Sequence, residues 1–147
     1  CNPYTMALSR THRIALISIA IFLAIFFVGS RTPNSEKVVF TRINDSSGTL
    51  VLNNKTYSVT IADTEGERSQ GLSGVPSLNP DEGMFFMFPK AGYQGFWMKD
   101  MNFPLDFVWI DSSWHVVGIT KNVPPSSYPS LFYPPRPAQY VLEIPAS

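Results

Sequence analysis

Most of the residues of this sequence that could bind a ligand lie in a stretch rich in large apolar side chains, residues 83–111. Lys99, Asp100 and Asn102 closely follow Trp97 and precede a proline, which is typical of a turn at the end of a strand. An aromatic face beside a lysine and carboxylates could bind a small acidic or sugar-like ligand. The alternative is a solvated turn with one surface ion pair, worth about 0–1 kcal/mol. Six residues are therefore candidates for ligand binding: Arg68, Trp97, Lys99, Asp100, Asn102 and Asp106.

Asp106 is the least expected residue of this set. In a strand it shares a face with Val108 and Ile110, so its carboxylate begins an apolar run. A buried carboxylate without a partner is strongly destabilising. Its partner is either a cation, Lys99 or Arg68, or the backbone amides of the preceding bend. We predict a structural role for Asp106 and keep ligand binding as the alternative.

The sequence does not predict metal, cofactor or nucleophile chemistry. The only cysteine is Cys1, and His115 is the only histidine after residue 12. A zinc site or a histidine-based triad needs more such residues than the chain offers. No glycine-rich phosphate loop is present. The methionines of residues 84–101 suit core packing better than copper ligation. We predict no catalytic residue, no metal and no cofactor.

The charge balance argues against a nucleic-acid partner. Residues 31–147 contain nine basic residues, the chain's eleven minus Arg10 and Arg13, against eleven acidic ones, a net charge of −2. Binding to phosphates needs clustered lysine and arginine, which this sequence lacks.

The N-terminal segment has the pattern of a secretory signal. Residues 14–28 carry no charge and follow the basic residues Arg10 and Arg13. As a helix at about 1.5 Å per residue they would span roughly 22 Å, less than the roughly 30 Å of a hydrocarbon core. A cleaved signal peptide and an uncleaved membrane anchor both remain open. Either one predicts an extracytoplasmic domain that is periplasmic, secreted or membrane-anchored.

The remainder of the chain reads as short strands with one brief helix. Thr64 and Glu67 form a predicted capping box, and Gly71 is the expected end of that helix. Prolines make residues 122–137 a loop. Strands are predicted over residues 37–43, 49–52, 55–62, 84–88, 96–99, 105–110, 114–120 and 140–144. Asn53 and Asn54 tolerate positive φ and predict a hairpin turn between the second and third of these strands.

This pattern predicts a mostly β domain, an antiparallel β-sandwich or small barrel with one short α-helix. The N-terminal apolar helix lies outside it. We assign residues 1–30 to the signal peptide or anchor, 31–36 to a linker and 37–147 to the β domain.

Five motifs in this order resemble the DUF192 family of small prokaryotic proteins. The resemblance covers residues 57–147 and implies a mostly β fold with one short helix and no known activity. Many members carry a signal peptide or an N-terminal anchor. Two departures are the loop at residues 73–75 and the end of the chain, where members continue further, so we expect a truncated C-terminus. The motifs are Glu67-Arg68-x-x-Gly71-Leu72, Gly83-Met84-x-Phe86-x-Phe88, Phe96-Trp97-Met98-Lys99, Pro104-Leu105-Asp106 and Tyr140-Val141-Leu142-Glu143.

Together these features predict an extracytoplasmic, non-enzymatic domain that binds a small polar ligand or a cell-envelope partner. One alternative is a hydrolase-like enzyme in which Asp106 is the acid or base and Lys99 or Arg68 stabilises charge. A second alternative is a structural accessory domain. The sequence does not indicate the ligand or the oligomeric state.

Overall fold

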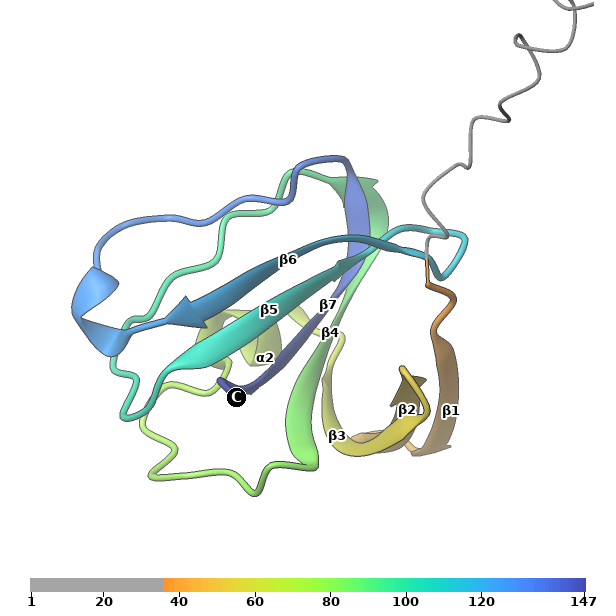
Figure 1. Cartoon of the computed structure of the whole chain (residues 1–147), viewed down its shortest axis with the longest axis horizontal. Coiled ribbons are helices and arrows are strands. Elements are labelled where there is room, and N and C mark those ends of the chain that lie inside the picture. The colour runs from red at the N-terminus through yellow and green to blue at the C-terminus, as the bar shows by residue number, and fades with distance from the viewer. Residues whose placement is uncertain (1–35) are drawn as a thin grey trace, which may run out of the picture. The chain divides into compact units, whose positions relative to one another are not determined.

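Alternating and continuous apolar runs give the β domain seven strands and one short α-helix in the computed structural model, which describes residues 36–147 (Figure 1). The predicted signal segment lies outside these residues. None of the helices in this range is long and apolar enough to cross a membrane. The elements are β1 (Val39–Asn44), β2 (Ser47–Leu52), β3 (Lys55–Ala62), α2 (Glu65–Gln70), β4 (Glu82–Gly92), β5 (Leu105–Ile110), β6 (Val116–Val123), the 3-10 helix η2 (Pro125–Ser127) and β7 (Ala138–Pro145).

The strands form one mixed sheet in the order β1-β2-β3-β4-β7-β5-β6. The prediction of a mostly β domain with one short helix is confirmed, but the prediction of a wholly antiparallel sheet is wrong at one place. β3 and β4 pair in parallel, because residues 63–81 carry the chain back along the sheet through α2. The helix is only six residues long, so its crossover role was not visible in the sequence.

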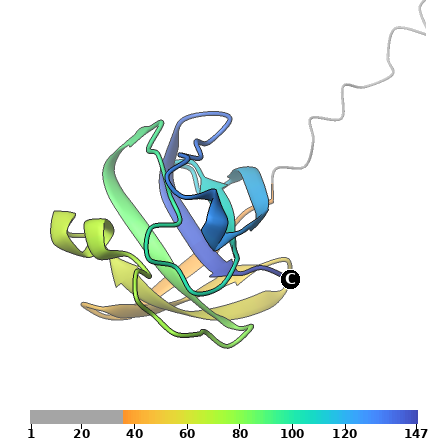
Figure 2. The same cartoon turned by 90° about the vertical axis from the view of Figure 1, so that its left-hand side faces the viewer.

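The sheet curls until its two edges meet at one end (Figure 2). Lys37, just before β1, forms an antiparallel bridge with His115, just before β6. The Val38 amide donates to the Trp114 carbonyl at 2.7 Å, and the Val116 amide donates to the Glu36 carbonyl at 2.9 Å. A single, partly closed sheet fits the predicted small barrel better than a sandwich of two sheets.

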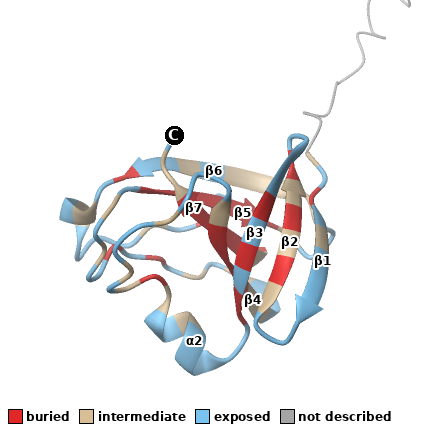
Figure 3. Cartoon of the chain, turned by 90° about the horizontal axis from the view of Figure 1, so that it is seen from below, coloured by how far each residue is buried: buried red, intermediate tan, exposed pale blue. Residues whose placement is uncertain are grey.

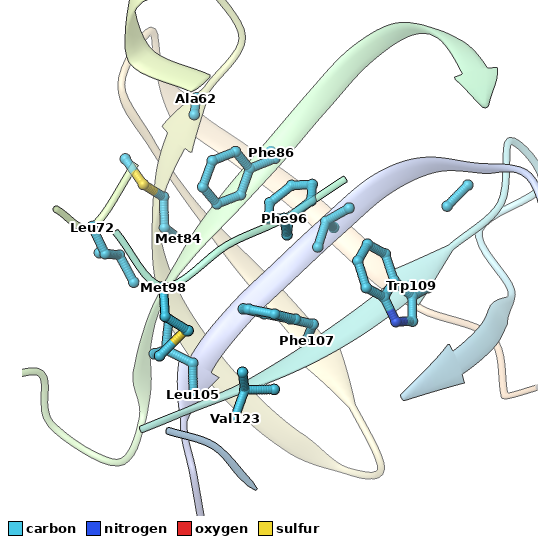
Figure 4. Close-up of a cluster of buried hydrophobic side chains, with 12 residues drawn as sticks. Ala62, Leu72, Met84, Phe86, Phe96, Met98, Leu105, Phe107, Trp109 and Val123 are labelled. Atoms are coloured by element: carbon cyan, nitrogen blue, oxygen red, sulfur yellow. The ribbon is translucent and has the colours of Figure 1, made fainter. Parts of the chain in front are cut away.

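The central strands are buried on both faces, and Figure 3 shows the burial concentrated on them. Every residue of β5 is buried, as expected for a strand between two others with both faces covered. Phe107 and Trp109 point to one apolar cluster, whereas Val108 and Ile110 point to the other. We call these cluster A and cluster B. Figure 4 shows cluster A, in which Phe96 lies between Phe86 and Trp109.

Local sequence signals account for the turn and the helix ends. Asn53 and Asn54 have positive φ of 52° and 58°, as a tight hairpin between β2 and β3 requires. The Thr64 hydroxyl accepts from the Glu67 amide, and the Glu67 carboxylate accepts from the Thr64 amide. Gly71 ends the helix with φ of 51°. The predicted hairpin, capping box and helix end are confirmed.

The prediction of a strand over residues 96–99 is wrong. β4 instead continues to Gly92, and the following segment crosses cluster A as irregular chain. Its ladder pairing is limited to one isolated bridge, between Phe96 and Phe132. Aromatic and apolar residues made this segment look like a strand, but their role is to cover the core.

Gly83 allows β4 and β7 to approach closely, which leads to a test of the fold. A Cβ at Gly83 would lie 2.5 Å from the Glu143 carbonyl oxygen, whereas one at Gly66 in α2 would meet nothing within 4 Å. We expect Gly83→Ala to lower the free energy of unfolding by about 1–3 kcal/mol, measured by urea denaturation. The matched control Gly66→Ala should raise it by up to about 1 kcal/mol. Equal effects of the two substitutions would contradict this packing.

Candidate functional site

A pocket of about 340 Å³ opens beside cluster A, which is near the lower end of small-molecule sites. Residues 65–73 of α2 and its C-terminal turn form one wall. Phe86 and Phe88 of β4 form a second wall, and the segment 94–101, apart from Met98 and Asp100, forms a third. Glu143 of β7 is the one strand residue outside β4 that lines it. The pocket therefore exists because α2 and an irregular segment cover this face of the sheet without filling it.

The pocket walls are largely aromatic. Phe86 and Phe96 meet edge to face with ring centroids 4.9 Å apart, and Phe88 and Phe96 do so at 6.2 Å. Such pairs hold the rings in defined positions. The walls thus present a rigid apolar surface on which a flat ring could pack.

Arg68 fastens α2 to the sheet at the edge of the pocket. Its guanidinium donates to the Asp63 carbonyl at 2.5 Å and to the Met87 carbonyl at 2.9 Å. The same group lies over the Phe88 ring, 5.3 Å from its centroid. Arg68 is therefore part of the pocket wall, with two of its donor interactions used to position the helix.

Glu143 places a carboxyl group among apolar side chains. β7 lies between β4 and β5, and Glu143 pairs with Met84 on one side and Phe107 on the other. Residues directly opposite in a ladder point to the same face, so the carboxyl lies between these two members of cluster A. Only 4% of Glu143 is exposed.

The surroundings of the Glu143 carboxyl favour its uncharged form at neutral pH. Burial raises its pKa from 4.5 to about 8, because the ionised form would lose its hydration. The Glu143 carboxyl makes no hydrogen bond to any of the described residues. Glu143 lines the pocket, and its side chain lies on the same face of the sheet as the pocket's aromatic walls. Glu143 thus offers the pocket an open hydrogen-bonding group.

The mouth of the pocket carries Trp97 and Lys99. Trp97 is 46% exposed, and the Lys99 ammonium lies 5.9 Å from its ring centroid. Both residues line the pocket. Three of the six sequence candidates, Arg68, Trp97 and Lys99, are therefore brought together at one site.

Asp100 and Asn102 have structural surroundings instead. Asp100 adopts a positive φ of 54° in an exposed turn, and its carbonyl accepts from the Gly74 amide at 2.9 Å. The Asn102 side chain donates to the Val75 carbonyl at 2.9 Å. These bonds tie the turn to the loop that follows α2, and neither residue lines the pocket.

Asp106 lies on the opposite face of the sheet from the pocket, with Val108 and Ile110 as predicted. It is buried, and its carboxylate accepts from the Asn122 amide at 2.6 Å. Neither of the partners expected from the sequence is found among the described residues. Asp106 forms no ion pair with Lys99 or Arg68, and the amide that donates to it belongs to Asn122 in β6 rather than to the bend that precedes β5. Asn122 has a positive φ of 53° at an irregularity between β5 and β6. Asp106 therefore stabilises a β-bulge.

Glu143 was not among the sequence candidates. The sequence predicts a strand that contains Glu143 beside Val141, but no local pattern indicates that this strand lies in the middle of the sheet. A glutamate inside a strand that is buried on both faces is the signal that would have identified it. That signal appears only once the position of β7 in the sheet is known.

With this geometry in place, the comparison with known protein families becomes informative. The profile of the DUF192 family, described as Uncharacterized ACR, matches residues 48–147. The chain belongs to the DUF192 family. This confirms the resemblance seen in the sequence motifs, and the DUF192 match includes every residue that lines the pocket.

Two solved structures resemble this DUF192 chain. One is from Sinorhizobium meliloti 1021 and is described as a candidate transcription regulator; it is 30% identical with a TM-score of 0.60, over 76% of this chain and 80% of that one. The other, from Novosphingobium aromaticivorans DSM 12444, is described as a protein of unknown function; it is 25% identical with a TM-score of 0.61, over 75% and 72%. No curated protein matches the chain.

The described residues contain no group of three or more histidine, cysteine, aspartate or glutamate side chains that could bind a metal. The pocket's own charged residues are Glu65, Arg68, Lys99 and Glu143. With Glu143 protonated, this set suits hydrogen bonding and ring packing rather than metal coordination.

The protonation of Glu143 predicts how stability changes with pH. The unfolded chain releases this proton near pH 4.5, whereas the folded domain keeps it to about pH 8. Between these values the folded state binds one more proton, so the contribution of Glu143 to the free energy of unfolding falls by about 1.4 kcal/mol per pH unit. In Glu143→Gln, which cannot ionise, urea denaturation should show this slope to be absent. Parallel curves for the two proteins would mean that Glu143 is ionised when folded.

Proposed function

We propose that this domain binds a small, uncharged ring compound in the pocket and that Glu143 orients it. The observation that carries the proposal is the buried carboxyl of Glu143, a residue that lines the aromatic pocket and whose side chain makes no hydrogen bond to the described residues. A desolvated polar group of this kind gains more from a ligand's hydrogen bond than an exposed group does.

The chemistry of the ligand follows from the walls. A protonated carboxyl is both a donor and an acceptor, which suits a hydroxyl or carbonyl group. The rings of Phe86, Phe88 and Phe96 suit a flat or alicyclic body. A ligand anion would lose its hydration among the apolar walls, and a ligand cation would meet Arg68 and Lys99 at the rim. A neutral ligand avoids both costs.

An enzymatic role would now depend on Glu143 rather than on Asp106, which lies on the other face of the sheet. A raised pKa suits a general acid. The pocket lining contains no histidine, and the Ser73 hydroxyl donates to the Lys99 carbonyl instead of to a base. We therefore favour binding without chemistry, and turnover of a bound ligand would reassign Glu143 as a general acid.

A role in transcription, which the Sinorhizobium protein's description gives for that protein, is not part of this proposal. Residues 36–147 contain eleven acidic residues against eight basic ones, the chain's eleven minus Arg10, Arg13 and Arg31. Such a balance offers no electrostatic support for binding phosphates.

We test the pocket with the full chain and a panel of neutral monosaccharides and uncharged aromatic alcohols, by thermal shift followed by calorimetry. A ligand at a hundred times its Kd stabilises the folded state by about 2.7 kcal/mol. Glu143→Leu keeps the volume of the side chain and removes its polar group, so the variant should fold at least as well and bind at least about tenfold more weakly.

The control is Asp106→Asn, which alters the other buried carboxylate. It should lower the melting temperature, because a charged hydrogen bond is worth about 1.5–3 kcal/mol, and leave affinity unchanged below that temperature. Equal affinity of the wild type and Glu143→Leu, or binding lost only in Asp106→Asn, would overturn the proposal.

We also propose that the domain acts outside the cytoplasm. The support is the uncharged run of residues 14–28 behind Arg10 and Arg13. A reporter enzyme that is active only after export, fused to the C-terminus, should be active. Replacing Arg10 and Arg13 by glutamate should reduce that activity. Activity of a cytoplasm-only reporter in the same fusion would contradict export.

A further inference from the structure

Two irregular segments meet beside the pocket mouth. Phe96 and Phe132 form an isolated antiparallel bridge, in which each amide donates to the other's carbonyl at 2.9 and 2.8 Å. Both rings point inward, Phe96 as a member of cluster A and Phe132 packed against it. Because side chains alternate along extended chain, the neighbours of these two residues point outward.

The residues next to Phe96 and Phe132 in the sequence connect the pocket with the loop of residues 124–137. Gly95 and Trp97 line the pocket. A Cβ at Gly95 would lie 2.9 Å from the Tyr133 ring and 3.2 Å from the Leu131 side chain. Glycine at this position lets the loop lie directly against the pocket mouth.

The surface that results is an exposed aromatic strip, made of Trp97, Tyr128, Leu131 and Tyr133. Their exposed fractions are 46%, 45%, 47% and 54%. Trp97 and Tyr128 meet edge to face with centroids 5.7 Å apart. A cluster of large exposed side chains that continues from a pocket marks a binding surface more often than isolated ones do.

The strip is uncharged. Residues 122–135 contain no acidic or basic side chain, and their polar side-chain groups other than the Asn122 amide are the hydroxyls of serines and tyrosines. A nucleic acid or an anionic membrane would need clustered lysine and arginine. Aromatic faces with hydroxyl groups match the C–H faces and hydroxyl groups of neutral sugar rings.

We propose that the ligand is a neutral glycan chain, with one pyranose ring in the pocket and the following rings packed across the aromatic strip. This inference rests on the proposed function, because the ring in the pocket is the one that Glu143 orients. The inference goes beyond the proposed function because it names the class of ligand. It also assigns Tyr128 and Tyr133 as residues that set the affinity for longer chains. Neither residue lines the pocket.

The test is calorimetric titration of the full chain with cello- and chito-oligosaccharides of increasing length, from the monosaccharide to the hexamer. Each sugar ring that packs on an aromatic side chain adds to binding, so affinity should rise at least about tenfold as rings are added over the strip. Tyr128→Ala and Tyr133→Ala should remove that gain and leave monosaccharide binding unchanged. Ile43→Ala, an exposed apolar side chain on β1, is the control and should change neither.

Three results would overturn the inference. Glu143-dependent binding that does not depend on chain length would leave the pocket proposal standing and remove the glycan chain. Tyr128-dependent binding to vesicles of phosphatidylglycerol and phosphatidylcholine, without oligosaccharide binding, would make the strip a membrane contact. The chain could also bind an aromatic alcohol in a Glu143-dependent way but bind no oligosaccharide or monosaccharide. That result would exclude sugars as the ligand and leave the pocket proposal standing.

Discussion

The desolvation of the central strands is the constraint on which the rest of this structure depends. β5 and β7 are covered on both faces, so any polar side chain that they carry must find a partner or an opening. Each strand carries one buried carboxyl group, Asp106 in β5 and Glu143 in β7. The two groups point to opposite faces and meet the same constraint in different ways.

Asp106 meets it with a hydrogen bond inside the fold, because the bulge of β6 turns the Asn122 amide toward it. Glu143 lies between Met84 and Phe107, which offer no polar atom suited to a carboxyl, and burial holds its pKa near 8. The carboxylate of Asp106 is therefore hydrogen-bonded within the protein itself. The carboxyl of Glu143 remains available for a hydrogen bond to a ligand. This difference, rather than burial alone, distinguishes a structural carboxyl from a candidate binding group.

Features set by neighbouring residues could be read from the sequence, and features set by distant segments could not. The boundaries of β5, the Asn53–Asn54 turn and the Thr64–Glu67 cap were predicted because each depends on a few adjacent side chains. The parallel pairing of β3 and β4 and the central place of β7 depend on long-range packing. Half of the candidate residues line the pocket. Glu143 was not predicted, because its burial depends on the position of β7 in the sheet and hence on long-range packing.

The location of the pocket follows from where regular structure ends. On the face of cluster A, a six-residue helix and irregular segments replace a second layer of sheet, and they leave a gap above Glu143. The Phe96–Phe132 bridge stabilises those segments without making them regular, so their alternate side chains face outward as Trp97, Leu131 and Tyr133. An open carboxyl in the interior and aromatic rings at the mouth thus arise from one arrangement. A substitution that loosens the bridge should therefore disturb the pocket and the strip together, whereas changes on the cluster B face should leave both intact.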